Sequence, residues 1–223
     1  MGKFIIKASE SHLYTIDGEP SLCLQKDTEA YYHSDYQGGG RWKIDGTIEN
    51  MICTLKNDIT TYTNFILSRK VTQLKQILQA DLSQIYKLCG NNNLMVCVVP
   101  RSKHEQHYKD NQKLFRQSIT DTISLLRRRG INFIDGTHNI VRHTDTACTR
   151  LARTGNGGNG ELPYCGITKE TCHIIGVKDK TILLIDDVYT KSVGIDEDCI
   201  QALYDNGAKK VIFYSVGKTV PRY

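Results

Sequence analysis

Hydrophobic and polar positions follow two different rhythms along this chain, and the rhythm changes near residue 93. From about Asn57 to Leu88 apolar residues recur every three to four positions, which predicts one long helix, or two with a break. Residues 93–99 then form a near-continuous apolar run that ends at Pro100, as expected for a strand buried on both faces. Helical spacing returns over about Gln112–Arg128, where apolar residues occupy one side of the predicted helix.

The C-terminal part of the chain repeats this pattern of strands and helices. The elements predicted there are strands at INFID (131–135), CHIIGV (172–177), TILLID (181–186) and 210–216, and a helix over 196–204. Between them, residues 142–170 are polar and contain NGGNG at 156–160, which predicts a long loop with a functional role or high mobility. This alternation is typical of an α/β fold with a mainly parallel sheet flanked by helices.

The first 56 residues have a different character. FIIKA, HLYTI and SLCLQ, separated by polar turns, predict short strands. The aromatic and glycine-rich stretch from Tyr31 to Thr47 predicts a loop or an irregular hairpin. We therefore expect a β-rich N-terminal addition over 1–56, acting as a hood or an interaction module, and an α/β domain over 57–223.

Cysteine usage and hydropathy limit the class of protein. The 223-residue chain has eight cysteines and no C-x-x-C pair, which favours reduced thiols over a disulfide scaffold. Cys165, Cys172 and His173 lack the tight four-ligand spacing of a structural zinc site. No apolar run approaches the ~18 residues of a membrane span. The expectation is a cytoplasmic protein without a membrane partner.

Positive charge is concentrated in one stretch. Residues 101–153 contain eleven Lys and Arg against five Asp and Glu, whereas the whole chain has a net charge of +5. Such a surplus suggests an anionic partner, either a phosphorylated small molecule or nucleic acid. For Arg127, Arg128 and Arg129 a solvated face at a helix C-terminus is the stronger interpretation.

The sharpest motif follows the predicted strand at 181–186. The strand ends in Asp186 and Asp187, and a short polar turn then leads into a helix. Ligands of open α/β sheets bind at the carboxyl ends of strands, and a helix N-terminus suits a phosphate. Adjacent carboxylates can hold sugar hydroxyls or a hydrated Mg²⁺. The motif therefore predicts a sugar-phosphate site.

At this motif the chain resembles a known family. ILLIDDVYT is similar to the phosphoribosyl-pyrophosphate (PRPP) signature of type I phosphoribosyltransferases, and the likeness is closest to the ComF-like, amidophosphoribosyltransferase-like branch. It continues in VCVVPRSK (96–103) and in IVRHTDTACTRLAR (140–153), and it covers roughly residues 93–220. By itself ILLIDD also fits the Mg²⁺-binding strand of P-loop NTPases, but the chain's one GKT, at 217–219, lacks the glycine that such a loop needs five residues earlier.

The resemblance implies a set of site residues. Asp186 and Asp187 would be the catalytic pair, contacting the ribose hydroxyls of PRPP directly or through Mg²⁺. A loop around 143–163 would close over the site. The 5′-phosphate would lie against the turn formed by Val188, Tyr189, Thr190, Lys191, Ser192, Val193 and Gly194, and the pyrophosphate against Arg101, Ser102 and Lys103.

The turn departs from the family pattern. Where the family has Thr/Ser-Gly-x-Thr/Ser, this chain has Lys191-Ser192-Val193-Gly194. Ser192 carries a Cβ where glycine lets the backbone approach a phosphate, and Gly194 lacks a hydroxyl, although Lys191 could supply a charge.

Two functions follow from this sequence. The first is an enzyme of nucleotide metabolism, a glycosyltransferase that passes phosphoribosyl from Mg²⁺–PRPP to a nitrogenous acceptor and releases pyrophosphate. The second is a non-catalytic module on the same fold that senses PRPP or a nucleotide, or that associates with nucleic acid through residues 101–153. Pairing into a homodimer is a further expectation from the fold.

Overall fold

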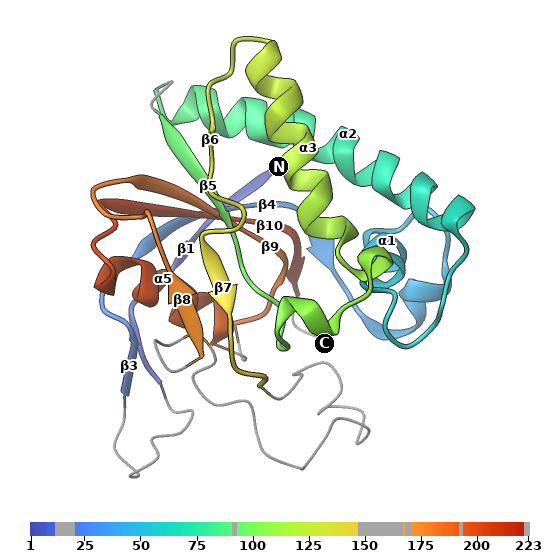
Figure 1. Cartoon of the computed structure of the whole chain (residues 1–223), viewed down its shortest axis with the longest axis horizontal. Coiled ribbons are helices and arrows are strands. Elements are labelled where there is room, and N and C mark those ends of the chain that lie inside the picture. Colours follow the sequence, from blue (N-terminus) through green and yellow to red (C-terminus); the bar gives the residue numbers. More distant parts are fainter. Residues whose placement is uncertain (12–20, 91–92, 147–166, 168–170, 192–193, 221–223) are drawn as a thin grey trace.

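The computed structural model describes residues 1–11, 21–90, 93–146, 167, 171–191 and 194–220 (Figure 1). Its centre is a six-stranded sheet in the order β1-β4-β10-β9-β5-β6. Strand β1 is antiparallel to β4, and every other neighbouring pair in this sheet is parallel. The strands span Gly2–Ile6 (β1), Thr28–Tyr36 (β4), Leu94–Val98 (β5), Ile134–Asp135 (β6), Thr181–Tyr189 (β9) and Lys210–Thr219 (β10). The α/β class with a mostly parallel sheet is thus confirmed.

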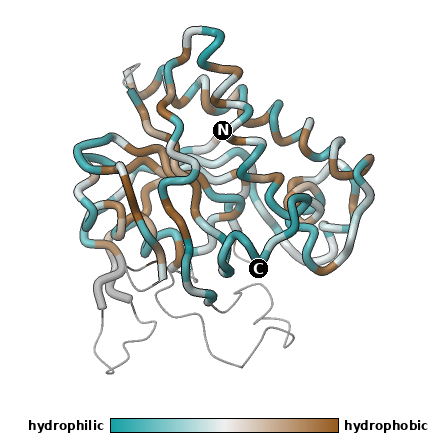
Figure 2. The backbone as a smooth tube through the Cα atoms, viewed as in Figure 1, coloured by the Kyte–Doolittle hydropathy of each residue, from teal (hydrophilic) through white to brown (hydrophobic). Residues whose placement is uncertain are grey.

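Helices cover both faces of this sheet. On one face lie α1 (Ile48–Lys56), α2 (Asn64–Leu88) and α3 (Leu114–Arg128), and on the other lies α5 (Ile195–Asp205) (Figure 1). Each face therefore has its own hydrophobic core, and Figure 2 shows the hydrophobic segments gathered around the central strands.

Strand β9 supplies side chains to both cores in alternation. Leu183 and Ile185 pack toward α1, α2 and α3, whereas Ile182 and Leu184 pack toward α5. Successive side chains of a strand point to opposite faces, and this alternation continues to Asp186 and Asp187, whereas Val188 packs on the α1–α3 side and Tyr189 on the α5 side.

A turn at residues 57–63 separates α1 from α2. Thr47 and Thr63 cap α1 and α2 by accepting hydrogen bonds from the backbone N–H groups of Asn50 and Ile66. Between these helices Asn57 adopts a left-handed conformation (φ 47°), and its side chain accepts a hydrogen bond from the Tyr62 backbone N–H. Over the predicted range 57–88 the structure has one helix, α2, whereas α1 lies before that range and was not predicted.

The prediction of a loop or an irregular hairpin over Tyr31–Thr47 was wrong for the first residues of that range. Thr28–Tyr36 is strand β4, which lies inside the sheet between β1 and β10. Gly39–Lys43 forms a short 3₁₀ helix. The dense aromatic residues that suggested irregular structure suit a pleated surface, and pairing with the distant strand β10 fixes them there.

Two smaller pairs of strands lie outside the central sheet. The predicted strand CHIIGV contains β8 (Cys172–Ile174), but β8 pairs antiparallel with β7 (Ile140–Arg142) instead of joining the parallel sheet. Near the N-terminus, β2 (Ser9–Ser11) pairs with β3 (Ser21–Leu24). HLYTI and the NGGNG segment lie outside the described residues. Within the described ranges, every helix is too short or too polar to cross a membrane.

Candidate functional site

The predicted site residues meet at the carboxyl edge of the parallel strands. Asp186 and Asp187 lie in the carboxyl-terminal half of strand β9, where Asp186 pairs with Ser215 of the neighbouring strand β10. On the other side, the Val99 backbone N–H donates to the Ile185 carbonyl over 3.0 Å, which brings the segment after β5 against the same strand end. The loop that contains Arg101 and the acidic pair are therefore neighbours in space.

The structure separates the two carboxylates that the motif places together. The Asp186 side chain is hydrogen-bonded to Asp196 in the first turn of α5. Asp187 instead forms an ion pair with Lys56, the last residue of α1, with 2.8 Å between Nζ and Oδ2. Because α1 and α5 cover opposite faces of the sheet, the two acids have different surroundings and different chemistry.

On the α5 face, carboxyl groups cluster and resist ionisation. Desolvation, and next the charge of Asp187, raise the pKa of Asp186 to about 7. Burial, and next the charge of Asp186, hold the pKa of Asp196 well above its ordinary value, and Asp196 is only 4% exposed. The hydrogen bond between the two side chains raises the pKa of Asp196 and lowers that of Asp186, so Asp196 is the carboxyl that holds the shared proton.

Glu197 extends this acidic cluster. Burial raises the pKa of Glu197, while the Tyr189 hydroxyl donates to its Oε1 over 2.8 Å. The other carboxyl oxygens, Asp196 Oδ1 and Glu197 Oε2, are buried without a hydrogen-bond partner among the described residues. Strongly perturbed carboxyl groups of this kind are enriched at functional sites.

On the opposite face, a network of basic and polar groups surrounds Asp187. The Arg101 guanidinium donates to the Lys56 carbonyl oxygen over 3.2 Å and to Asp58 Oδ2 over 3.1 Å. It also donates to the Gln112 carbonyl oxygen over 2.9 Å and lies 4.2 Å from the centroid of the Tyr108 ring. The C-terminus of α1 thus holds Asp187 through Lys56 and holds Arg101 through its backbone and Asp58.

Lys56 is a candidate site residue that the sequence analysis did not predict. It lies at the boundary drawn between the two predicted regions, and a single lysine before an asparagine carries no motif. Only the packing of α1 beside α2 and α3 brings it to the acidic pair. The sequence could predict only that two adjacent carboxylates, Asp186 and Asp187, need some cation nearby, and not which residue supplies it.

The predicted pyrophosphate loop is held chiefly through its backbone. The Ser102 carbonyl accepts a hydrogen bond from the Thr146 backbone N–H over 2.7 Å and from the Thr146 hydroxyl over 3.1 Å. The Lys103 N–H donates to the Tyr108 hydroxyl over 3.1 Å, and the Lys103 residue is exposed. Lys103 can reach a ligand without breaking a side-chain contact that the structure records.

The predicted phosphate turn is described only in part. Thr190 shares a hydrogen bond with Thr219 over 2.8 Å, Lys191 is exposed, and Gly194 (φ 73°) begins α5 without a capping side chain. Val188 and Tyr189 belong to β9, and the Tyr189 ring packs 5.0 Å from Phe4. Ser192 and Val193 lie outside the described residues.

The charge of the α5 terminus works against a phosphate. Three acidic residues, Asp196, Glu197 and Asp198, occupy the first turn of α5. Acidic side chains already occupy this end of the helix, so a bound phosphate would compete with them for the free N–H groups.

A magnesium ion fits one of the two acids better than the pair. Within the described ranges no three His, Cys, Asp or Glu side chains form a group that could hold a metal ion. Chelation by Asp186 and Asp187 together does not fit, because the two side chains face opposite sides of the sheet. Asp187 presents carboxylate oxygens, and Mg²⁺ commonly takes one or two carboxylates while substrate phosphates and water supply the rest.

Cysteine chemistry adds nothing to this edge. Cys53, Cys89, Cys97, Cys172 and Cys199 are free thiols, as predicted for these five. Cys165, the other cysteine of the zinc alternative, lies outside the described residues. Burial raises the pKa of the Cys97 thiol to about 12, so this side chain behaves as a small hydrophobic group.

No protein-family model matches this chain, and the comparison with curated proteins gives no match either. The geometry of the carboxyl edge is therefore the basis for a functional hypothesis.

Proposed function

We propose that this protein binds PRPP, or a closely related phosphorylated ribose, at the carboxyl edge of its sheet and transfers the phosphoribosyl group to a nitrogenous acceptor. The observation that carries the proposal is the position of Asp186 and Asp187 in the carboxyl-terminal half of β9, an inner strand of a mostly parallel sheet that ends at Tyr189 and is followed by the turn into α5. Open α/β sheets bind ligands at this kind of edge. The type I phosphoribosyltransferase fold belongs to the same proposal.

The surroundings of Asp187 suit a sugar that carries a charged leaving group. Asp187 would accept hydrogen bonds from the ribose hydroxyls after exchanging its ion pair with Lys56. Lys56 and Lys103 would then face the pyrophosphate, whose negative charge grows as its bond to the ribose breaks. Bound through the pyrophosphate and Asp187, Mg²⁺ would supply further neutralisation of that leaving group.

Asp186 would act from the other face of the strand. Its hydrogen bond to protonated Asp196 fixes the carboxyl group in one orientation beside the turn. A carboxylate at this point would favour the positive charge that develops on the ribose ring while the leaving group departs.

One observation favours the non-catalytic alternative. The acidic first turn of α5 and the Lys191-Ser192-Val193-Gly194 sequence weaken the phosphate-binding turn on which catalysis would depend. A protein that binds PRPP or a nucleotide as a signal would tolerate weaker phosphate binding. The association with nucleic acid through residues 101–153 is part of this alternative, and a steep fall of affinity with salt would be its mark.

Calorimetry on matched variants tests the proposal. Wild-type protein is titrated with PRPP with and without Mg²⁺, beside Asp187→Asn and the control Asp179→Asn, which alters an exposed acid before the amino end of β9. We expect Mg²⁺-dependent binding that Asp187→Asn weakens by about tenfold or more, because a charge-assisted hydrogen bond contributes roughly 1.5–3 kcal/mol. Asp179→Asn should bind as the wild type does.

Two results would contradict the proposal. Folded wild-type protein that binds no PRPP would exclude the ligand, and unchanged binding by Asp187→Asn would exclude this edge. If PRPP binds, release of pyrophosphate in the presence of candidate acceptors separates the enzyme from the non-catalytic alternative.

A further inference from the structure

A basic cavity lies next to the loop that follows β5. It encloses about 60 Å³ between this loop and the N-terminal end of α3. Its charged lining consists of five basic residues and one acidic residue: Arg101, Lys103, Lys113, Arg116, Arg142 and Glu105. A water molecule needs roughly 10–15 Å³ of such space, so the cavity has room for about four waters or for one small polyatomic ion.

Arg116 has few hydrogen-bond acceptors around its guanidinium group in the described part of the chain. Its side chain is 14% exposed, and Nη1 lies 3.3 Å from Glu105 Oε2. Glu105 is the acceptor that the described residues provide for it, and a guanidinium has five N–H donors. No Arg116 nitrogen is both fully buried and without a hydrogen bond among the described residues, and the Arg116 side chain lines the cavity.

Arg142 brings a second guanidinium to the same cavity from β7. It is 4% exposed, and its Nε donates to the Arg101 carbonyl oxygen over 2.6 Å. This hydrogen bond fixes the position of the side chain with respect to the loop after β5. Two arginines from elements far apart in the sequence therefore converge on one small space.

The N-terminus of α3 adds to the positive potential of the cavity. No side chain caps this terminus, and its first turn contains no acidic residue, in contrast to the three acids at the start of α5. Free N–H groups and the helix dipole favour an anion at such a terminus. The cavity wall also contains Val99, Pro100 and Phe115, which can contact the uncharged part of a ligand.

We propose that this cavity is a binding site for one oxyanion group, a phosphate or a carboxylate, held by Arg116 and Arg142. The fork of a guanidinium matches both groups, since it can donate two parallel hydrogen bonds. Glu105 occupies part of the place that the anion would take, and it moves aside on binding because its side chain is 36% exposed. Arg101 and Lys103 of the predicted pyrophosphate loop also line this cavity, but the inference rests on Arg116 and Arg142 and does not require PRPP to bind at Asp187.

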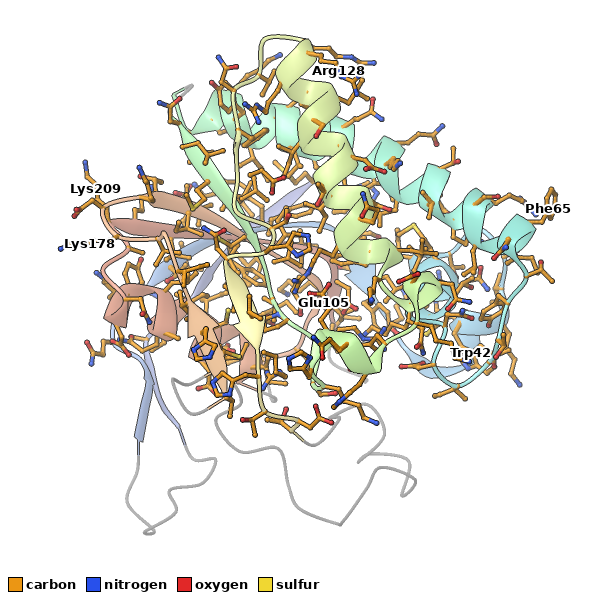
Figure 3. The ribbon with its side chains drawn as sticks, in the orientation of Figure 1. Trp42, Phe65, Glu105, Arg128, Lys178 and Lys209 are labelled. Carbon is orange, nitrogen blue, oxygen red and sulfur yellow. The ribbon has the colours of Figure 1, made fainter. Side chains whose placement is uncertain are left out.

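The test measures binding of small anions to variants of one helix. Wild-type protein, Arg116→Gln and Arg128→Gln are titrated calorimetrically with sodium phosphate and, separately, with sodium acetate, with chloride holding the ionic strength constant. Arg128 is an exposed residue at the opposite end of α3, far from Glu105 (Figure 3), and serves as the matched control. Tighter binding of phosphate identifies a phosphate site, and tighter binding of acetate identifies a carboxylate site.

We expect Arg116→Gln to weaken binding of the preferred anion by about tenfold or more, which is the loss typical of one charge-assisted hydrogen bond. Arg128→Gln should bind as the wild type does. Glu105→Gln should strengthen binding several-fold, because it removes the one acid from the lining. This variant decides the question even if Arg116→Gln fails to fold.

Three results would overturn the inference. The first is equal anion binding by wild type and Arg116→Gln, or weaker binding by Glu105→Gln. The second is loss of the anion in Asp187→Asn but not in Arg116→Gln, which would place it in the sugar-phosphate site. The third is a folded wild type that binds neither anion at matched ionic strength. Failure of PRPP binding alone leaves the cavity site standing, so the two proposals fail separately.

Discussion

The two edges of the parallel sheet treat a carboxyl group in opposite ways. At the amino edge, Glu29 accepts hydrogen bonds from Lys3 over 2.7 Å, from Tyr31 over 2.7 Å and from Lys210 over 3.3 Å. The first two bonds are the main reason that the pKa of Glu29 falls to about 2. At the carboxyl edge, desolvation and neighbouring acids raise the pKa of Asp186 to about 7.

This difference separates a stabilising edge from the edge at which we propose that a ligand binds. Residues selected for stability alone are expected to resemble Glu29, where every charge has a partner. Ionisation of Asp186, Asp196 or Glu197 destabilises the folded protein. Sites that bind or transform ligands commonly contain groups that destabilise the fold in this way. The contrast predicts opposite responses of the two edges to pH and to mutation.

Asp196→Asn should produce the largest effect, and it should be stabilising. The folded-state pKa of Asp196 lies above its unfolded value of about 3.8. The contribution of Asp196 to the free energy of unfolding is therefore fully present below about pH 3.8, and it decreases as the pH rises above that value. Asparagine keeps a hydrogen-bond donor toward Asp186 without this decline. We expect the variant to be more stable than wild type by about 2 kcal/mol at pH 8 and equal to it near pH 4.

Urea unfolding at pH 4, 6 and 8 measures this prediction, and Asp179→Asn controls for the loss of one negative charge. A variant that is less stable than wild type at pH 8 would show that the Asp196 carboxyl stabilises the fold and would remove the contrast between the edges.

Lys56→Met should have a smaller effect in the destabilising direction. Lys56 and Asp187 are 27% and 17% exposed, so the loss of the cation leaves a half-buried carboxylate without its partner. We expect a decrease of about 1 kcal/mol in the free energy of unfolding at pH 7, with Lys56→Arg near wild type. Because the Lys56 charge lowers the pKa of Asp186, that pKa should rise further in Lys56→Met.

A carboxyl-selective ¹³C NMR titration of both variants follows this pKa directly. A pKa of Asp186 that stays unchanged in Lys56→Met would mean that the two faces of the strand are electrostatically independent.

Glu29→Gln should have the smallest effect, and its pH dependence should have the opposite sign to that of Asp196→Asn. The pKa of Glu29 is lowered from 4.5 to about 2, so its contribution is present above about pH 4.5 and is lost as the pH falls toward 2. Solvent screens this edge, which limits the expected loss to about 0.5–1 kcal/mol at pH 7. Thermal unfolding at pH 7 and pH 2.5, with and without 0.5 M salt, measures the difference, and a loss that persists at pH 2.5 would contradict the prediction.

Local patterns were enough to predict much of the fold. The apolar run at 93–99 gave β5, helical spacing gave α3 and α5, and the strand before Asp186 and Asp187 gave β9. The motif also predicted that these acids lie at the carboxyl edge of the sheet, because a polar turn that leads from a strand into a helix lies at that edge in an α/β fold. Periodicity and turn chemistry act over a few residues, so the sequence displays them directly.

The contacts that give the site its chemistry are long-range, and only the tertiary structure decided them. Pairing with β10 makes Thr28–Tyr36 a strand, and the packing of α1 places Lys56 on Asp187. The pleat of β9 turns Asp186 and Asp187 to opposite faces, and the convergence of α3 and β7 brings Arg116 to Arg142. Such partners are chosen by which surfaces the chain buries together, because burial and Coulomb interactions depend on distance in space and not on distance along the sequence.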